Sequence, residues 1–431
     1  MIYCFHYKKH YLNDIEIIIL QHKNSTSKSF NAIENGRERY MRILYYTWYE
    51  NSKKDMVDTF ETLGHKVIEC NISFQSYERD EIFEKQLKRM VLEMQCDLIF
   101  SFDFFPLIAR VAEMLHKKYL SWIYDSPNYT LFSKTVRCDQ NYIFIFDQAQ
   151  CEVVRKLGAK KVHHLPLAVN AKRLNKQLGN LEQEVKYCCD VSFVGSLYDQ
   201  NLYDQICYLP EYLRGYLEGI MAVQQKIYGY NLIPELLSDH IVKELNKYVN
   251  FGMSKDYMIS DERMYSDALN AKITSNTRIH LLNEIAGKFN LNVYTASNKK
   301  LISNATIKEP IDYYQKMPEV FRSSKINLNM TLRSIETGIP LRALDIMGAG
   351  GFLMSNYQEE LGKNFCDGKE LVFFESETDL LDKISYFLFH NEERKEIAYH
   401  GWEKVQLKFS YLKQVRKMLN LAGVEEKDGQ E

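Results

Sequence analysis

The sequence predicts an α/β protein made of two doubly wound domains that face each other across a cleft. Three observations support this prediction. Apolar runs of strand length alternate with helical segments along most of the chain, and the alternation restarts after a polar stretch at residues 170–186. A length of 431 residues with 45% hydrophobic and 13% aromatic content is also enough to fill two cores.

The first domain is expected over residues 41–180. Its strands are predicted at 42–46, 66–69, 97–102, 119–124, 142–146 and 162–169, and its clearest helices at 53–63, 106–117 and 149–157. This order predicts a parallel sheet with helices on both faces. Residues 1–40 are expected to be an appended extension or the product of an upstream start codon, with a functional arm as the alternative.

The second domain is expected over residues 186–410. Its strands are predicted at 191–194, 291–295, 326–330, 352–354 and 371–374. A tyrosine-rich, mainly helical insertion occupies residues 197–290, and a later helix is expected to begin near Pro340. Residues 411–431 are expected to form a C-terminal helix and a frayed, solvated tail.

Composition restricts the classes of function. A formal net charge of −2 gives no support for broad electrostatic binding to nucleic acid or to an anionic membrane. The most apolar early run, residues 15–20, is too short to span a bilayer and lacks the cleavage region of a signal peptide. Nine cysteines without a C-x-x-C spacing argue against a zinc site or a disulfide framework and for a reducing, cytoplasmic environment. No other metal-binding motif is present, so metal independence is expected.

Residues 325–356, KINLNMTLRSIETGIPLRALDIMGAGGFLMSN, contain the strongest candidate binding site. A strand that leads into a helix opens a cleft at the strand's carboxyl end, where the first helix amides favour a phosphate. Arg342 is expected to bind this phosphate, and Asp345, on the same helix face, to accept from ribose hydroxyls. The alternative is an ion pair between the two. Arg333, just past the strand, is expected to add a second cation, with a solvated loop arginine as its alternative.

Glycines accompany both ends of this predicted domain. Gly195 follows the strand at 191–194, where the absence of a side chain lets the backbone approach a ligand, although one glycine after a strand is weak evidence. Gly348, Gly350 and Gly351 mark the end of the predicted helix. Neither G-x-G-x-x-G nor G-x-x-x-x-G-K-[ST] occurs, so a dinucleotide oxidoreductase and a P-loop protein both lack support.

A general base is expected at the carboxyl edge of the first sheet. Asp125 follows the strand at 119–124 and is expected to accept the proton of an acceptor hydroxyl. Capping of the next turn is an equally strong alternative for Asp125. Asp147 is expected to cap the following helix, and His163 and His164 are expected to be structural.

Several segments, taken in order, resemble one family of enzymes. They are MRILYYTWYE, SWIYDSPN, FIFDQAQ, HHLPLAVN, DVSFVGSLYD, INLNMTLRS, GIPLRALDIMGAGGFLMSN and ERKEIAYHGWEKV. Together they are similar to CgeB or spore-maturation-type glycosyltransferases, in which a DUF3880 domain precedes a glycosyltransferase family 1-like domain. The resemblance covers residues 41–420 and implies a GT-B architecture, with the sugar nucleotide on the C-terminal half and the acceptor on the N-terminal half.

The resemblance also extends to site residues. It implies a nucleotide-sugar role for Arg342, Asp345 and the glycines at 348–351, with Gly195 and Arg333 nearby. Broader GT-B enzymes carry a glutamate where Asp345 stands, and Glu336 lies at the wrong spacing to complete their usual glutamate pair. This departure puts the role of Asp345 in question.

The sequence therefore favours a glycosyltransferase that moves a sugar from a nucleotide-diphosphate sugar, with a UDP-sugar favoured, to a hydroxyl of a cell-surface or spore-surface glycan or protein. No tightly bound cofactor is expected. A non-catalytic GT-B-like module that binds glycans or nucleotide sugars during surface assembly is one alternative. A nucleotide-sugar epimerase or a phosphorylase is the other. Oligomeric state and stereochemical outcome stay open.

Overall fold

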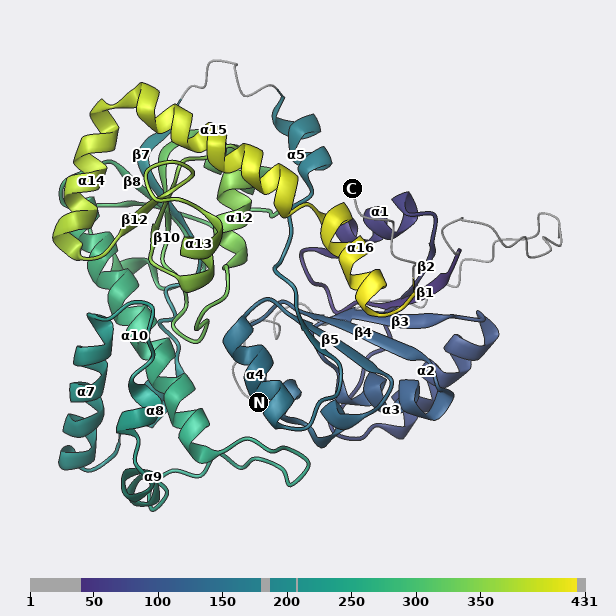
Figure 1. The fold of residues 1–431 in the computed structure, drawn as a ribbon. Coiled ribbons are helices and arrows are strands. Elements are labelled where there is room, and N and C mark those ends of the chain that lie inside the picture. The colour runs from purple at the N-terminus through teal and green to yellow at the C-terminus, as the bar shows by residue number, and fades with distance from the viewer. Residues whose placement is uncertain (1–39, 180–186, 207, 425–431) are drawn as a thin grey trace.

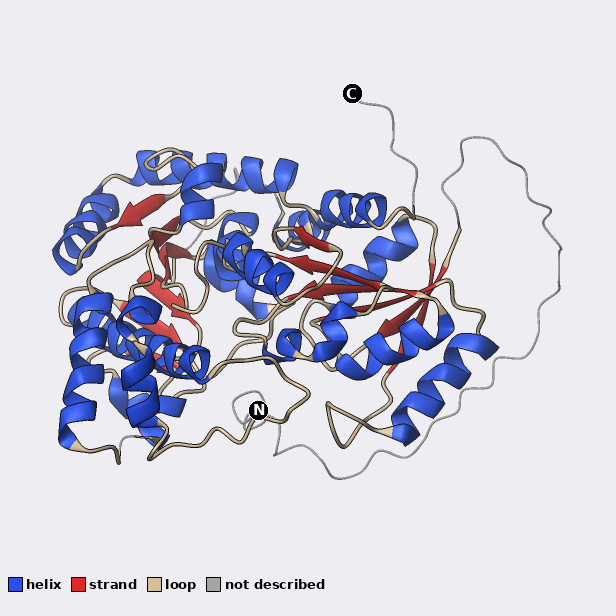
Figure 2. Cartoon of the chain, turned by 60° about the horizontal axis from the view of Figure 1, so that its bottom comes forward, coloured by secondary structure: helices blue, strands red, loops and turns tan. Residues whose placement is uncertain are grey.

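The computed structural model describes residues 40–179, 187–206 and 208–424, and these residues contain two six-stranded sheets. Each sheet forms the centre of its own half of the molecule (Figure 1). All strands are parallel, in the orders β2-β1-β3-β4-β5-β6 and β12-β11-β10-β7-β8-β9. Helices cover the sheets, so the expected α/β fold with two doubly wound units is confirmed (Figure 2). We call the unit around the first sheet the N-terminal lobe and the unit around the second sheet the C-terminal lobe.

The central strands of the N-terminal lobe are short apolar segments buried on both faces, as helices on both sides of a parallel sheet require. Its elements are β1 (Arg42–Tyr46), α1 (Lys53–Thr62), β2 (Lys66–Cys70), α2 (Glu81–Glu93), β3 (Leu98–Phe102), α3 (Pro106–Leu115), β4 (Lys118–Ile123), β5 (Asn141–Ile145), α4 (Gln148–Lys156), β6 (Val162–His164) and α5 (Ala171–Leu178). Strand β6 is shorter than the predicted 162–169, because the chain leaves the sheet after His164 to reach the other lobe. The predicted extension at 1–40 lies almost wholly outside the described residues.

The C-terminal lobe repeats this architecture with a helical insertion. Its elements are β7 (Cys189–Val194), α6 (Leu202–Gln205), α7 (Glu211–Gln225), α8 (Ile233–Leu236), α9 (Asp239–Leu245), α10 (Asp261–Ala286), β8 (Leu291–Tyr294), β9 (Thr306–Lys308), α11 (Lys316–Arg322), β10 (Ser324–Asn329), α12 (Leu341–Gly348), β11 (Leu353–Asn356), α13 (Glu359–Asn364), β12 (Val372–Phe374), α14 (Glu377–Phe389) and α15 (Asn391–Lys408). The last helix, α16 (Tyr411–Leu421), lies on the N-terminal lobe. The insertion, α6 to α9, packs on α10 around a small core of its own. The edge strand β9 has no counterpart in the sequence prediction.

The chain crosses between the lobes twice, and the two crossings are hydrogen-bonded to each other. The first follows β6, and the second joins α15 to α16, which returns to the N-terminal lobe and packs on α1 (Figure 1). The Val169 amide donates to the Phe409 carbonyl (2.9 Å), and the Tyr411 amide donates to the Val169 carbonyl (3.1 Å). Nearby, Arg173 donates two hydrogen bonds, of 2.8 and 3.0 Å, to the buried carboxylate of Asp55. The crossings therefore form a paired hinge.

Candidate functional site

The strand orders locate the site. In each sheet, successive strands are added outwards in both directions from one pair of neighbours, β1 and β3 in the N-terminal lobe and β7 and β10 in the C-terminal lobe. Ligands of doubly wound proteins bind at the carboxyl ends of the strands beside such a switch point. A cavity of about 400 Å³ lies between the two switch points. It is lined by the loops after β1, β3, β4, β7 and β10 and by part of α10.

The N-terminal wall of this cavity carries two carboxyl groups. Asp103 follows β3 and Asp125 follows β4, and Oδ1 of Asp103 accepts the backbone N–H groups of Tyr124 (2.9 Å) and Asp125 (3.1 Å). Burial and, after it, the charge of the adjacent Asp125 together raise the pKa of Asp103 to about 8. Near neutral pH, Asp103 therefore holds a proton.

The structure thus places Asp125 in the cavity, and its role as a base stays a prediction. Asp103 was missing from the sequence prediction. The sequence pattern that identified Asp125, an aspartate just after a buried strand, could also have identified Asp103.

The C-terminal switch point holds a buried cation, Arg278. Its guanidinium donates to the Ser196 carbonyl after β7 (2.6 Å) and to the Met330 carbonyl after β10 (3.1 Å from Nε). It also lies over the Tyr198 ring, 5.1 Å from the ring centroid. Burial lowers the pKa of Arg278 to about 10, so it remains charged at neutral pH. In the part of the chain that the structure describes, no carboxylate forms an ion pair with it, so its charge favours an anion in the adjacent crevice.

Arg342 and Asp345 meet in the first turns of α12. Arg342 Nη1 lies 3.2 Å from Asp345 Oδ2, so the ion pair that the sequence left as an alternative is formed. The Tyr313 hydroxyl donates to the other carboxylate oxygen (3.1 Å). Burial raises the pKa of Asp345 to about 6, against the opposing effect of Arg342. The pair lies at the end of α12 that faces the N-terminal lobe, and its predicted contacts with phosphate and ribose stay predictions.

Arg333 contacts the helical insertion. Its guanidinium donates to the carbonyls of Gln225 (3.0 Å) and Ile227 and lies over the Tyr228 ring, 4.1 Å from the centroid. Burial lowers the pKa of Arg333. These contacts use its donors to hold the loop after α7 and favour a structural role over the predicted contact with a diphosphate.

The predicted glycines lie at opposite ends of the strands of the second sheet. Gly195 lies at the carboxyl end of β7, where its amide donates to the Tyr294 carbonyl (3.0 Å). Gly348, Gly350 and Gly351 lie at the far end of α12, before β11 begins. Gly350 has a φ of 74°, and a Cβ on Gly351 would lie 2.7 Å from the Phe321 carbonyl. The three glycines therefore form a turn and allow close packing at the amino end of β11. This position argues against their predicted place in the nucleotide site.

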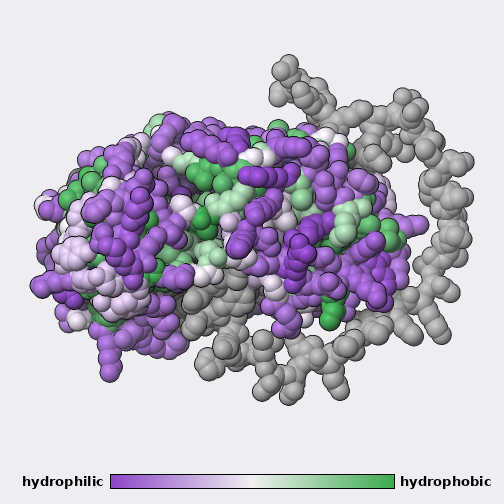
Figure 3. All heavy atoms as spheres, turned by 90° about the horizontal axis from the view of Figure 1, so that it is seen from below, coloured by the Kyte–Doolittle hydropathy of each residue, from purple (hydrophilic) through white to green (hydrophobic). Residues whose placement is uncertain are grey.

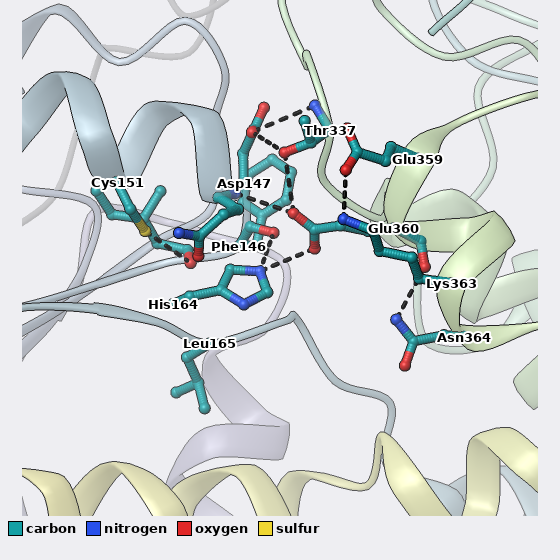
Figure 4. A network of polar contacts seen from close by, with 12 residues as sticks. Phe146, Asp147, Cys151, His164, Leu165, Thr337, Glu359, Glu360, Lys363 and Asn364 are labelled. Carbon is teal, nitrogen blue, oxygen red and sulfur yellow. Dashed lines mark hydrogen bonds and ion pairs between the residues drawn. The ribbon is translucent and has the colours of Figure 1, made fainter.

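A polar network joins the lobes just before α12 (Figure 4). Asp147 caps α4 as expected, through the Ala149 amide (3.0 Å), and its carboxylate also accepts the Glu336 amide (2.7 Å) and the Thr337 hydroxyl (2.8 Å). Glu360 contacts His164 Nε2 (2.8 Å) and accepts the Gln148 amide (2.9 Å). This network fixes the loop that leads into α12 against the N-terminal lobe, a contact that the sequence prediction missed.

The described residues contain neither a cluster of metal ligands nor a helix that could span a membrane. Within the described ranges, no group of three or more His, Cys, Asp or Glu side chains is placed to hold a metal ion. Over the same residues, no helix combines the length and apolar character needed to cross a bilayer. In Figure 3 the visible face is mostly hydrophilic, with hydrophobic areas towards the boundary between the lobes.

Comparisons with known proteins agree with this architecture. Residues 275–420 match a family model described as glycosyl transferase-like. No curated protein matches the chain. Sucrose-phosphate synthase from Thermosynechococcus elongatus has a similar structure, with a TM-score of 0.51 and 10% identity over 88% of this chain and 98% of that one. HepE from Anabaena, solved in complex with UDP-glucose, gives a TM-score of 0.51 and 9% identity over 89% of this chain and 99% of that one. The chain therefore has the GT-B fold, and its C-terminal lobe is similar to glycosyl transferase-like domains.

Proposed function

We propose that this protein is a glycosyltransferase that moves a sugar from a nucleotide-diphosphate sugar to an acceptor hydroxyl. One observation carries the proposal: a single cavity joins the switch points of both sheets, with a carboxyl pair on one wall and a buried arginine behind the other. Such a cavity brings an acceptor from the N-terminal lobe up to a donor on the C-terminal lobe. The glycosyl transferase-like match of residues 275–420 supports the same conclusion.

The donor lies at the carboxyl ends of β7 and β10 in this proposal. The free amides and dipole at the start of α12, together with Arg342 and the field of Arg278, stabilise the diphosphate as its negative charge grows. Asp345 accepts from the ribose hydroxyls. A UDP-sugar is the favoured donor, because HepE, which shares the fold, was solved with UDP-glucose.

The acceptor is activated on the opposite wall. Asp125 accepts the proton of the acceptor hydroxyl while that oxygen forms a bond to the anomeric carbon of the donor sugar. The bond between this carbon and the diphosphate oxygen breaks, and the electron pair leaves with the diphosphate. Neighbouring Asp103 stays protonated near neutral pH, so it adds no negative charge beside Asp125. Apposition of the lobes excludes water, which otherwise competes as acceptor.

Finer aspects of the proposal rest on the sequence resemblance. We assign the chain to the CgeB or spore-maturation type, with a DUF3880-like first domain, cytoplasmic location and no metal requirement. A cell-surface or spore-surface glycan or protein is the corresponding acceptor.

Nucleotide binding and donor turnover test the proposal. Purified protein is titrated with UDP, GDP and dTDP by calorimetry, and donor hydrolysis is followed by mass spectrometry with each corresponding sugar nucleotide. Binding with no turnover under any acceptor would favour the non-catalytic module, and conversion of the donor sugar without transfer would favour the epimerase. If none of the three diphosphates binds, the donor site is wrongly placed.

A matched pair of variants locates the donor site. Arg342→Gln should weaken nucleotide binding by roughly 10- to 150-fold, since one charge-assisted contact is worth roughly 1.5–3 kcal/mol. Arg322→Gln is the control. Arg322 is a similarly half-buried arginine, but it lies just before the amino end of β10, away from the proposed donor site. Equal losses in both variants would attribute the effect to general destabilisation.

A further inference from the structure

We propose that the acceptor group that enters the cavity between the lobes is an uncharged sugar ring, held against aromatic side chains. This inference rests on the proposed function and names the acceptor class for the same site. Aromatic rings, the charge of the walls and the fixed polar groups each support it.

Aromatic side chains dominate the wall, and they come from both lobes. They are Trp48, Tyr77, Phe104, Phe105, Tyr129, Tyr198 and Tyr257. Several are held in place by their neighbours: the Trp48 indole donates to the Phe102 carbonyl (3.0 Å), and the Tyr77 and Phe105 rings stack with an interplanar angle of 11°. A pyranose presents a flat face of C–H groups, which packs on such rings, while its hydroxyls project from the edge.

The described lining residues disfavour an anionic acceptor group. Among the lining residues that the structure describes, none is lysine, arginine or histidine, and three are aspartates. Asp267 is paired with Arg263 (3.0 Å), and Asp103 and Asp125 add two further carboxyl groups to the lining. An anionic acceptor group brought against this lining would lose its hydration, and no described lysine, arginine or histidine among the lining residues would replace it.

Small polar groups are available for sugar hydroxyls. Ser126 of the N-terminal lobe and Ser334 of the C-terminal lobe both line the cavity, and their hydroxyl oxygens lie 3.3 Å apart. They can exchange hydrogen bonds with a vicinal diol at the boundary between the lobes. At about 400 Å³ the cavity is at the small end of ligand sites, so it holds one or two rings and leaves the rest of a longer glycan outside.

Paired ligands that differ only in charge test the inference. In the presence of UDP, binding is measured by calorimetry and saturation-transfer NMR for methyl glycosides of glucose, galactose and N-acetylglucosamine and for the methyl glucuronide and galacturonide. We expect at least one neutral glycoside to bind at least tenfold more tightly than either uronide. Equal or tighter binding of a uronide would overturn the inference, as would no binding of any glycoside at millimolar concentration or tighter binding of a serine peptide.

The aromatic wall is tested with matched tryptophan variants. Trp48→Leu should weaken binding of the best neutral glycoside at least tenfold, and Trp48→Phe should restore most of it. Trp402→Leu is the control, because Trp402 is equally half-buried but lies on α15, outside the cavity. Unchanged glycoside binding in Trp48→Leu would refute stacking on this ring.

UDP affinity and donor turnover separate this inference from the transferase proposal. Neither tryptophan variant should change UDP affinity, which also confirms that the variants are folded. If glycosides bind as expected but no donor is turned over, the transferase proposal fails and the cavity remains a sugar-binding site. If donor is turned over but only anionic acceptors are modified, the transferase proposal stands and the inference about acceptor class fails.

Discussion

Between pH 6 and pH 8 the N-terminal lobe should lose stability, and replacing Asp103 with asparagine should abolish most of this loss. The substitution suits the site. Asp103 has a φ of 58°, a left-handed conformation that asparagine tolerates well, and its Oδ1 alone accepts the two backbone N–H groups. An amide oxygen can accept the same two bonds. The main change is the loss of a titrating proton.

The direction and size of this change in stability follow from the pKa of Asp103. Burial and the neighbouring Asp125 raise the pKa of Asp103 to about 8 in the folded protein, against about 3.9 in an unfolded chain. The folded protein thus binds the proton more tightly, and the resulting stability is complete below pH ~4 and lost as the pH rises through about 8. The limiting slope is about 1.4 kcal/mol per pH unit. Because Asp125 shares the titration, we expect a loss of roughly 1–3 kcal/mol between pH 6 and pH 8.

Thermal unfolding of wild type and Asp103→Asn at half-unit steps from pH 6 to pH 8.5 measures this loss. At roughly 2–4 °C per kcal/mol for an unfolding unit of this size, the Tm of wild type should fall by about 2–12 °C more than that of the variant. Asp58→Asn, which removes an exposed aspartate on α1, should follow wild type. Parallel curves for wild type and Asp103→Asn would refute the argument that Asp103 carries a proton in the folded state.

Three other perturbations have defined outcomes. Asp55→Asn should lower the free energy of unfolding by about 3–5 kcal/mol, because Arg173 would lose its buried partner; a loss below about 1 kcal/mol in urea unfolding would contradict this. Gly338→Ala would place a Cβ 2.9 Å from the Asp147 Cα, so the lobes should move apart, and an unchanged radius of gyration in X-ray scattering would show that the loop absorbs the methyl group. UDP affinity should fall below pH 6, where Asp345 becomes protonated, and calorimetry should find this dependence absent in Asp345→Asn; equal pH dependence in both proteins would remove the ribose role.

The sequence predicted the fold well because local patterns determine it. Parallel strands buried on both faces, such as β3 and β4, are continuous apolar runs that stand out from the amphipathic helices around them. The edge strand β9 was missed because its three residues are partly exposed and carry no such run. Strand β6 was predicted too long, since the apolar residues after His164 continue the strand pattern while they are used in the core shared by the lobes.

The site was predicted only in part because tertiary contacts decide it. Asp125 was found through its place after a strand, but Arg278 lies in the middle of a long helix, and nothing in its neighbours indicates that the helix aims it at two strand ends. Arg333 follows a strand, as a residue that contacts the diphosphate would, yet its guanidinium is bound to the helical insertion. The glycines at the end of α12 fit a phosphate loop and a tight turn equally well, and only the direction of the helix separates these two roles.

The hydrogen-bonded crossings at Val169 restrict how the cleft can move. Two bodies joined by one flexible strand can twist, swing and tilt independently. The bonds from Val169 to Phe409 and Tyr411 tie the two crossings together at one point, with the Asp55 and Arg173 pair close by. Twisting and tilting would break these bonds as well as those of Asp147 and Glu360 across the lobes, whereas rotation about an axis through Val169 would keep the bonds at the crossings. Opening and shutting then follow a single coordinate, and each closure returns Asp125 to the same position opposite α12.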